Sequence, residues 1–158
     1  MSLDVMEILL VEDSSADVEL TRRALRQDAL LSRIHIARNG EEALNFIYCR
    51  GPFRERIVEP LPQLILLDPK MPKVDGLSVL RTLKEDPRTR SIPVIILTSS
   101  KEEKDVVKSY DLGVNSYIQK PVDFGQFPET IHTLGLYWLV FNQGPPQQTL
   151  KAVAEKTG

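Results

Sequence analysis

The sequence is poor in the residues that build disulfide frameworks and thiolate or imidazole metal sites. Its 158 residues include one cysteine, Cys49, and two histidines, His35 and His132. A lone cysteine excludes an internal disulfide and a multi-cysteine metal site, and it suits a reducing compartment. Because neither histidine has a partner at ligand spacing, we interpret both as structural or exposed residues and Cys49 as a packing residue.

The sequence also lacks a dominant charge and a long apolar run. The 20 Lys and Arg residues are balanced by 22 Asp and Glu residues, and the net charge of -2 argues against a nucleic-acid binder that works through phosphate contacts. No apolar run approaches the ~18–20 residues of a membrane span, and the first residues do not form a basic-then-apolar signal sequence. With 42% hydrophobic and 27% charged residues, the chain is expected to fold as one soluble, cytoplasmic domain.

What the sequence does contain is a regular alternation of aliphatic runs and helix-like stretches. The predicted strands are residues 7–11, 33–37, 64–67, 92–97 and 115–120. The predicted helices begin at Ser14, Asn39, Asp75 and Ser100, and a last apolar helix covers about residues 123–142. Residues 50–62, which are rich in glycine and proline, predict a loop.

This alternation predicts an α/β domain whose parallel sheet is covered by helices on both faces. The continuous aliphatic strand at residues 64–67 agrees, because strands that are buried on both faces lose the polar alternation. We expect the domain to cover residues 5–142. Residues 143–158 are polar and contain proline, which predicts a tail that is loose at its end.

Polar side chains follow the predicted strands at the points where the strands end. Glu12 and Asp13 follow the first strand, and Asp68 follows the third. The carboxyl ends of parallel strands meet at one edge of a sheet, so these carboxylates should lie together, beside Thr98 and Lys120 from the last two strands. Crowded carboxylates repel one another unless a cation joins them, and hard oxygen ligands suit Mg²⁺ or Mn²⁺. The hydroxyl and the ammonium group complete a pocket for an anion such as a phosphoryl group.

Four segments, LLVEDSSAD, LILLDPKMPKVDG, VIILTSS and YIQKPVD, resemble in order and spacing the motifs of the receiver domain of two-component response regulators. The resemblance implies a flavodoxin-like, doubly wound sheet of five parallel strands in the order 2-1-3-4-5. It implies a signalling protein that takes a phosphoryl group from a sensor histidine kinase and then switches a protein-interaction face. Such a protein is not an enzyme beyond its own phosphorylation and dephosphorylation, and because no output domain fits after residue 142, we expect it to act by binding partners or by relaying the phosphoryl group.

The resemblance also assigns roles to individual residues. Asp68 matches the phosphoacceptor. The Mg²⁺ (or Mn²⁺) ligands would be Glu12, largely through water, Asp13, Asp68 and the backbone carbonyl of Lys70. The positions matched to phosphoryl binding and switching are Thr98, Ser99, Lys120 and Tyr117, and Lys120–Pro121 matches a cis peptide bond.

The two residues that follow Asp68, Pro69 and Lys70, depart from the family pattern, so alternative functions stay open. Pro69 has no backbone N–H, so a phosphoryl contact from that position is lost. Lys70 places a cation where it is expected to shield the acyl phosphate from water and prolong its life. One alternative is therefore a degenerate receiver that acts as a constitutive, phosphorylation-independent binding module. A phosphatase of the haloacid-dehalogenase type is disfavoured, because it needs a second acid at the position of Lys70.

The last predicted helix carries more apolar surface than one buried face requires. Its LGLYWLVF stretch is apolar on nearly every side, and an exposed apolar patch usually marks an interface. The candidate homodimer residues are Leu136, Tyr137, Leu139 and Val140. Burial by residues 50–62 or by the tail is the alternative. The segment LGLYWLVFNQGPP also resembles the C-terminal extension of stand-alone receivers that pair with phytochrome-like histidine kinases, so such a kinase, an unknown downstream protein and a second copy of the chain are the expected partners.

Overall fold

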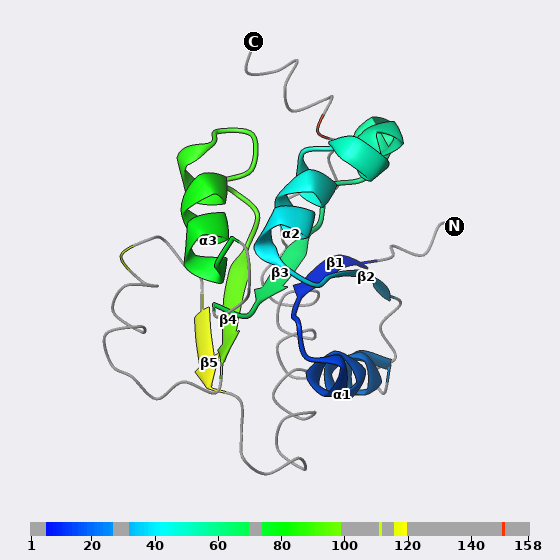
Figure 1. Cartoon of the computed structure of the whole chain (residues 1–158), viewed down its shortest axis with the longest axis vertical. Helices are drawn as coiled ribbons and strands as arrows, with labels where there is room; N and C mark the ends of the chain where they lie inside the picture. Colours follow the sequence, from blue (N-terminus) through cyan, green and yellow to red (C-terminus); the bar gives the residue numbers. More distant parts are fainter. Residues whose placement is uncertain are drawn as a thin grey trace.

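In the computed structural model, the described residues are 6–26, 32–69, 74–98, 111, 116–119 and 150. They form a parallel sheet of five strands in the order β2-β1-β3-β4-β5 (Figure 1). The strands are β1 (Met6–Val11), β2 (Ser32–Ala37), β3 (Leu64–Leu67), β4 (Val94–Thr98) and β5 (Ser116–Gln119). The helices are α1 (Ser15–Arg26), α2 (Gly40–Ile47) and α3 (Gly76–Glu85), with a 3-10 helix, η1 (Gly51–Val58). The predicted fold class and strand order are confirmed.

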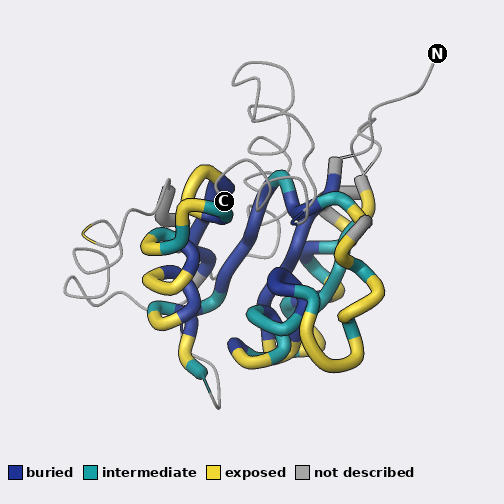
Figure 2. The backbone as a smooth tube through the Cα atoms, turned by 90° about the horizontal axis from the view of Figure 1, so that it is seen from above, coloured by how far each residue is buried: buried dark blue, intermediate teal, exposed yellow. Residues whose placement is uncertain are grey.

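The sheet is buried on both faces because its central strands are aliphatic throughout. All of β3 is buried, and alternate strand residues contribute to two separate core clusters (Figure 2). Leu9 and Ile65 belong to the cluster that includes residues of α2 and α3, whereas Ile8 belongs to the cluster that includes Val18 of α1. Helices α2 and α3 therefore cover one face and α1 covers the other (Figure 1), as the period-2 geometry of strands requires.

The described helices begin where the sequence predicts them, and their caps explain why. The Ser14 hydroxyl accepts a hydrogen bond from the backbone N–H of Asp17 at 3.3 Å, just before α1. Asn39 and Asp75 act in the same way at the starts of α2 and α3, where their side chains accept from Glu42 N and Ser78 N, each at 2.8 Å. Each cap satisfies a helix donor that has no partner within the helix.

The prediction that residues 50–62 form only a loop is wrong, because η1 occupies most of this segment. Proline is tolerated in a first helical turn, and Pro52 lies there. Arg56 fixes η1 to the core: it donates to the backbone oxygens of Phe46 at 2.6 Å and Pro60 at 3.3 Å. Burial lowers the pKa of the Arg56 guanidinium, although this group stays charged at neutral pH. Cys49 precedes η1 with a φ of 55° and packs on the core, as predicted.

One residue of the predicted tail belongs to the core. Leu150 is helical, only 5% exposed, and part of the same buried cluster as Tyr48 and Leu83. At this position the C-terminal segment therefore contributes to core packing. The candidate dimer residues Leu136, Tyr137, Leu139 and Val140 lie outside the described residues. Among the described helices, none is long and apolar enough to cross a membrane.

Candidate metal and phosphoryl site

Three carboxylates meet at the carboxyl edge of the sheet. The backbone N–H of Glu12 donates to Ala37 O at 2.9 Å, and that of Asp68 donates to Val11 O at 3.0 Å, so both acids directly continue the strand ladders. Each of Glu12, Asp13 and Asp68 offers a carboxylate oxygen that lies within 4.8 Å of the others. We call these three residues the acid cluster. The strand order brings them together as the sequence predicts, because β1 and β3 are neighbours in the sheet.

The members of the acid cluster differ in burial. Glu12 is only 3% exposed, Asp13 is exposed, and Asp68 is half-buried. The backbone N–H of Asp13 donates to a Glu12 carboxylate oxygen at 3.2 Å, which holds the buried acid in place. Three hard oxygen donors at this spacing fit Mg²⁺ or Mn²⁺, which bind carboxylates and retain several waters. The exposed Asp13 and the half-buried Asp68 leave the open side that a substrate needs.

The start of α3 fixes the backbone that carries Asp68. The N–H of Gly76 donates to Pro69 O at 3.0 Å. A Cβ atom on Gly76 would overlap the carbonyl oxygen of Asp68 and lie 2.6 Å from the Cα of Pro69. Glycine is therefore required here because only it allows the helix to approach the backbone of Asp68 so closely. The sequence marks Asp75-Gly76 as a helix start but carries no sign of this second role.

A second glycine supports the far end of the same loop. A Cβ atom on Gly40 would overlap the carbonyl oxygen of Val74 and lie 2.9 Å from its Cβ. Val74 directly precedes the Asp75 cap of α3, so the first turn of α2 packs against the end of the β3–α3 connection. The Asn39-Gly40 pair was visible in the sequence as a helix start, but this contact depends on how two distant segments meet.

Of the remaining predicted site residues, only some lie among the described residues. Thr98 is the last residue of β4, and the register Leu67↔Ile96 places its backbone one step beyond the level of Asp68. Tyr117 lies on β5 and pairs with Ile96. Lys70, Ser99, Lys120 and Pro121 lie outside the described residues, and so does the predicted cis peptide bond. The roles of these residues stay predictions.

Fold and acid cluster together define a doubly wound α/β domain with an acidic site at the carboxyl edge of its sheet. The family model of the response regulator receiver domain matches residues 8–132. The chain therefore belongs to the response regulator receiver family, as its motifs indicated.

Curated relatives are similar over most of their own length. The response regulator Rcp1 of Synechocystis sp. is 38% identical over 132 residues, covering 84% of this chain and 88% of Rcp1. The probable methanogenesis regulatory protein FilR2 of Methanothrix harundinacea is also 38% identical, over 142 residues, covering 90% of this chain and 89% of FilR2. Both matches span a chain of nearly the same size as this one.

Solved structures of response regulators are also similar to this chain over most of their length. The Mn²⁺-bound form of Rcp1 has a TM-score of 0.82 at 36% identity, covering 89% of this chain and 99% of that one. The phosphorylated cyanobacterial phytochrome response regulator RcpA has a TM-score of 0.84 at 35% identity, covering 90% and 99%. The bacteriophytochrome response regulator RtBRR is 48% identical with a TM-score of 0.72, covering 97% and 91%. The chain is thus similar to stand-alone response regulators associated with phytochromes, as predicted.

Proposed function

We propose that the chain is a stand-alone response regulator that accepts a phosphoryl group on Asp68 from a sensor histidine kinase. The observation that carries the proposal is the acid cluster: Asp68 ends a buried strand with its carboxylate within 4.8 Å of oxygens of Glu12 and Asp13. Family membership and a solved relative described as phosphorylated support the same function.

The chemistry assigned to Asp68 is nucleophilic. A carboxylate oxygen of Asp68 attacks the phosphorus of a donor phosphohistidine in line with the leaving nitrogen. The Asp68 O–P bond forms as the donor N–P bond breaks, and the electron pair of the broken bond returns to the donor imidazole. β3 holds the nucleophile rigidly, because all four of its residues are buried, and this positioning is the main catalytic contribution of the fold.

Glu12, Asp13, Asp68 and the carbonyl of Lys70 are the proposed Mg²⁺ or Mn²⁺ ligands. A bound divalent cation supplies positive charge that offsets the crowded carboxylates and the charge on the transferring phosphoryl oxygens. A relative whose structure is described as Mn²⁺-bound supports this assignment. Thr98, Ser99 and Lys120 are proposed to hold phosphoryl oxygens, and Tyr117 to change its packing when Thr98 moves.

The proposed partners follow from the relatives and from the sequence. Similarity to RcpA and RtBRR supports a phytochrome-like histidine kinase as the donor. FilR2 is equally similar to this chain as Rcp1 and is described as a methanogenesis regulatory protein, so the downstream output is left open. A homodimer through Leu136, Tyr137, Leu139 and Val140 remains part of the proposal, on the strength of their apolar sequence pattern alone.

Pro69 favours one alternative function, a phosphorylation-independent binding module. It is buried directly after the acceptor, and its carbonyl accepts from Gly76. Without an N–H it cannot donate to a phosphoryl oxygen. The intact acid cluster counts against this alternative, since a constitutive module has no use for three crowded carboxylates.

The deciding experiment is intact-mass measurement after incubation with Mg²⁺ and acetyl phosphate. The wild-type chain should gain one phosphoryl group, and D68N should gain none, because an amide cannot form the acyl phosphate. D111N removes an exposed acid far from β3 in the sequence and should behave like the wild type. Slow decay of the added mass would support the shielding role of Lys70.

Two results would refute the proposal. Phosphorylation of D68N at the wild-type level would place the acceptor elsewhere. A wild-type chain that binds Mg²⁺ but gains no mass would favour the phosphorylation-independent module instead. Replacement of Pro69 by a residue with a backbone N–H would then be the next variant to test.

A further inference from the structure

We propose that a cavity at the amino ends of β1 and β2 binds a small aromatic carboxylate. Its volume is about 320 Å³, which is near the lower end of the ~300–1,000 Å³ of natural ligand sites and suits a ligand of one or two rings. Glu7 and Arg33 are the second residues of β1 and β2, so the cavity lies at the sheet edge opposite the acid cluster. We call it the amino-end cavity.

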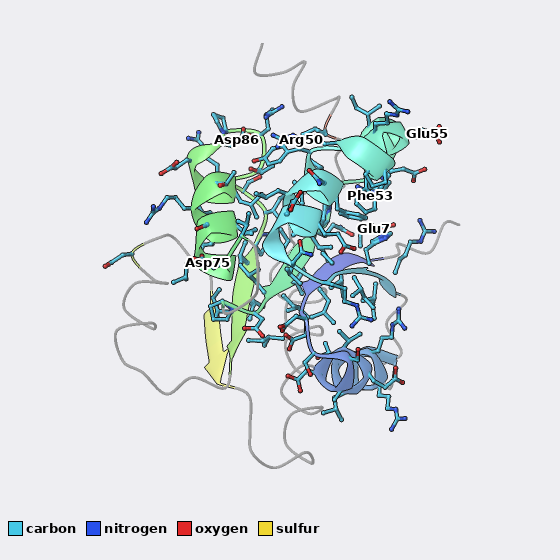
Figure 3. The ribbon with its side chains drawn as sticks, viewed as in Figure 1. Glu7, Arg50, Phe53, Glu55, Asp75 and Asp86 are labelled. Carbon is cyan, nitrogen blue, oxygen red and sulfur yellow. The ribbon has the colours of Figure 1, made fainter. Side chains whose placement is uncertain are left out.

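Aromatic rings form the walls of the amino-end cavity. Phe46 of α2 and Phe53 of η1 meet edge to face, with their ring centroids 5.4 Å apart at 73°. The His35 ring lies 4.9 Å from Phe46. Figure 3 shows Phe53 lying over Glu7, between η1 and the sheet. Aromatic groups of this kind favour a flat ring through offset or edge-to-face contacts.

The floor of the cavity is a buried carboxylate that already has its partners. Glu7 is only 4% exposed. One of its oxygens lies 2.8 Å from His35 Nε2, and the other lies 3.3 Å from an Arg33 nitrogen. Since burial of a carboxylate requires such compensation, we interpret Glu7 as the group that orients His35 and Arg33. A cation would have to displace these partners, so a cationic ligand is disfavoured.

At the rim of the cavity the Arg33 guanidinium can pair with an anion, although the lining as a whole balances two arginines against two acids. The Arg33 side chain is 59% exposed and, within the described part of the chain, pairs with Glu7 through one nitrogen. Its planar guanidinium keeps further N–H donors for a carboxylate. Arg56 is a second cation of the lining and Glu59 the acid that faces them. The Arg56 guanidinium lies 3.5 Å from the centroid of the Phe46 ring, so it also covers one aromatic wall.

Rings in the walls and a guanidinium at the rim together select an aromatic ring that carries a carboxylate. Phosphate alone would not use the aromatic walls. This inference does not depend on phosphorylation of Asp68, because the cavity lies at the other edge of the sheet and shares no residue with the acid cluster.

The test is a titration of the full chain with benzoate and with indole-3-acetate, in the absence of any phosphoryl donor. Binding is monitored through the backbone amide chemical shifts. Both acids should bind with a Kd on the order of a millimolar, as expected for about ten non-hydrogen atoms. Benzamide, which has the ring without the charge, should bind about tenfold more weakly, because charge-assisted hydrogen bonds are the stronger ones.

Variants locate the site. R33Q should weaken benzoate binding about tenfold, whereas R54Q, the same change at an exposed η1 arginine outside the lining, should leave it unchanged. R33K keeps the ion pair with Glu7 but loses the planar guanidinium. Its affinity for benzoate should therefore lie between the affinities of R33Q and the wild type. If R33Q does not fold, F53A removes a wall instead and should also weaken binding.

Several outcomes would overturn the proposal, and the first three concern binding itself. They are no binding of either acid at millimolar concentration, equal binding of benzoate and benzamide, and benzoate binding that R33Q, R33K and F53A leave unchanged. Chemical-shift changes confined to residues outside the lining would also reject it. Binding of a peptide that contains an aromatic residue beside an acid, without binding of the free acids, would assign the cavity to a protein partner and reject a small-molecule site.

Discussion

At the scale of single residues, the backbone of Asp68, the proposed acceptor, depends on a neighbour that has no side chain. Gly76 lets α3 begin directly against the backbone of Asp68 and Pro69. Its contribution is geometric: it packs against the backbone from which the Asp68 carboxylate extends. In-line transfer requires this placement to within a fraction of an ångström.

We expect G76A to damage stability and phosphorylation together. The added methyl group would overlap the Asp68 carbonyl, and relief of that overlap should cost about 1–3 kcal/mol and shift the acceptor. Urea unfolding measures the first effect, and the initial rate of mass gain with acetyl phosphate measures the second.

G51A is the matched control for this variant. Gly51 has a φ of +56° and open space around its Cα, so alanine should cost about 1 kcal/mol through the left-handed backbone alone. Its phosphorylation rate should equal that of the wild type. A G76A protein that is phosphorylated at the wild-type rate would show that the contact does not position Asp68.

A charged pair after α3 predicts a pH dependence of stability. The Arg88 guanidinium donates to both carboxylate oxygens of Asp86, at 2.8 Å in the shorter bond, and these bonds hold the pKa of Asp86 below its usual value. A lowered folded-state pKa stabilises the fold above the unfolded-state pKa of about 3.9, and this contribution is lost as the pH falls through the folded-state value.

Urea unfolding of wild type and D86N should show this loss. The stability difference between them should be constant from about pH 7 to about pH 5 and shrink below about pH 4. E85Q, at an exposed acid next to Asp86, leaves the Asp86–Arg88 pair intact and controls for the loss of one carboxylate from this segment. A D86N difference that stays constant down to about pH 2 would mean that the pair does not stabilise the fold.

At the scale of elements, the sequence predicted what local chemistry decides. Strand β3 matches its prediction to the residue, and Ser14, Asn39 and Asp75 cap helices because their side chains reach N–H groups three residues ahead. The acid cluster was also predictable, since parallel pairing of neighbouring strands brings their carboxyl ends together whatever the loops do.

Features that depend on distant contacts were missed. The 3-10 helix η1 is fixed by hydrogen bonds from Arg56 to Phe46 and Pro60, and nothing in its glycine- and proline-containing sequence reveals those partners. The pair of Glu7 and His35 joins residues 28 positions apart, so His35 was interpreted as structural without its partner. Gly40 and Gly76 looked like helix starts, because a close backbone approach has no signal in the sequence other than glycine itself.

At the scale of the whole molecule, the chain returns to its core at Leu150. Its side chain is 5% exposed and belongs to the cluster between the sheet and helices α2 and α3. The domain predicted to end at residue 142 therefore uses at least one later residue, Leu150, for packing.

L150A should lower the free energy of unfolding by about 2–4 kcal/mol, through lost burial and the cavity that remains. I57A is the control, because Ile57 is 44% exposed and its truncation should cost no more than about 0.5–1 kcal/mol. The urea midpoint should fall for L150A while the slope stays the same. Equal midpoints for the two variants would show that Leu150 is not part of the cooperative unit.

Strand β1 has a consequence for how signals combine. Glu7 is its second residue and Glu12 directly follows its last, and its pairing with β2 and β3 on both sides leaves it no freedom to slide. The two ends are roughly 17 Å apart, and each buried carboxylate has its own local partners. A stiff strand and locally compensated charges transmit little free energy between them. A metabolite at one edge and a phosphoryl group at the other would then act as independent inputs, and their effects on the unfolding free energy would simply add.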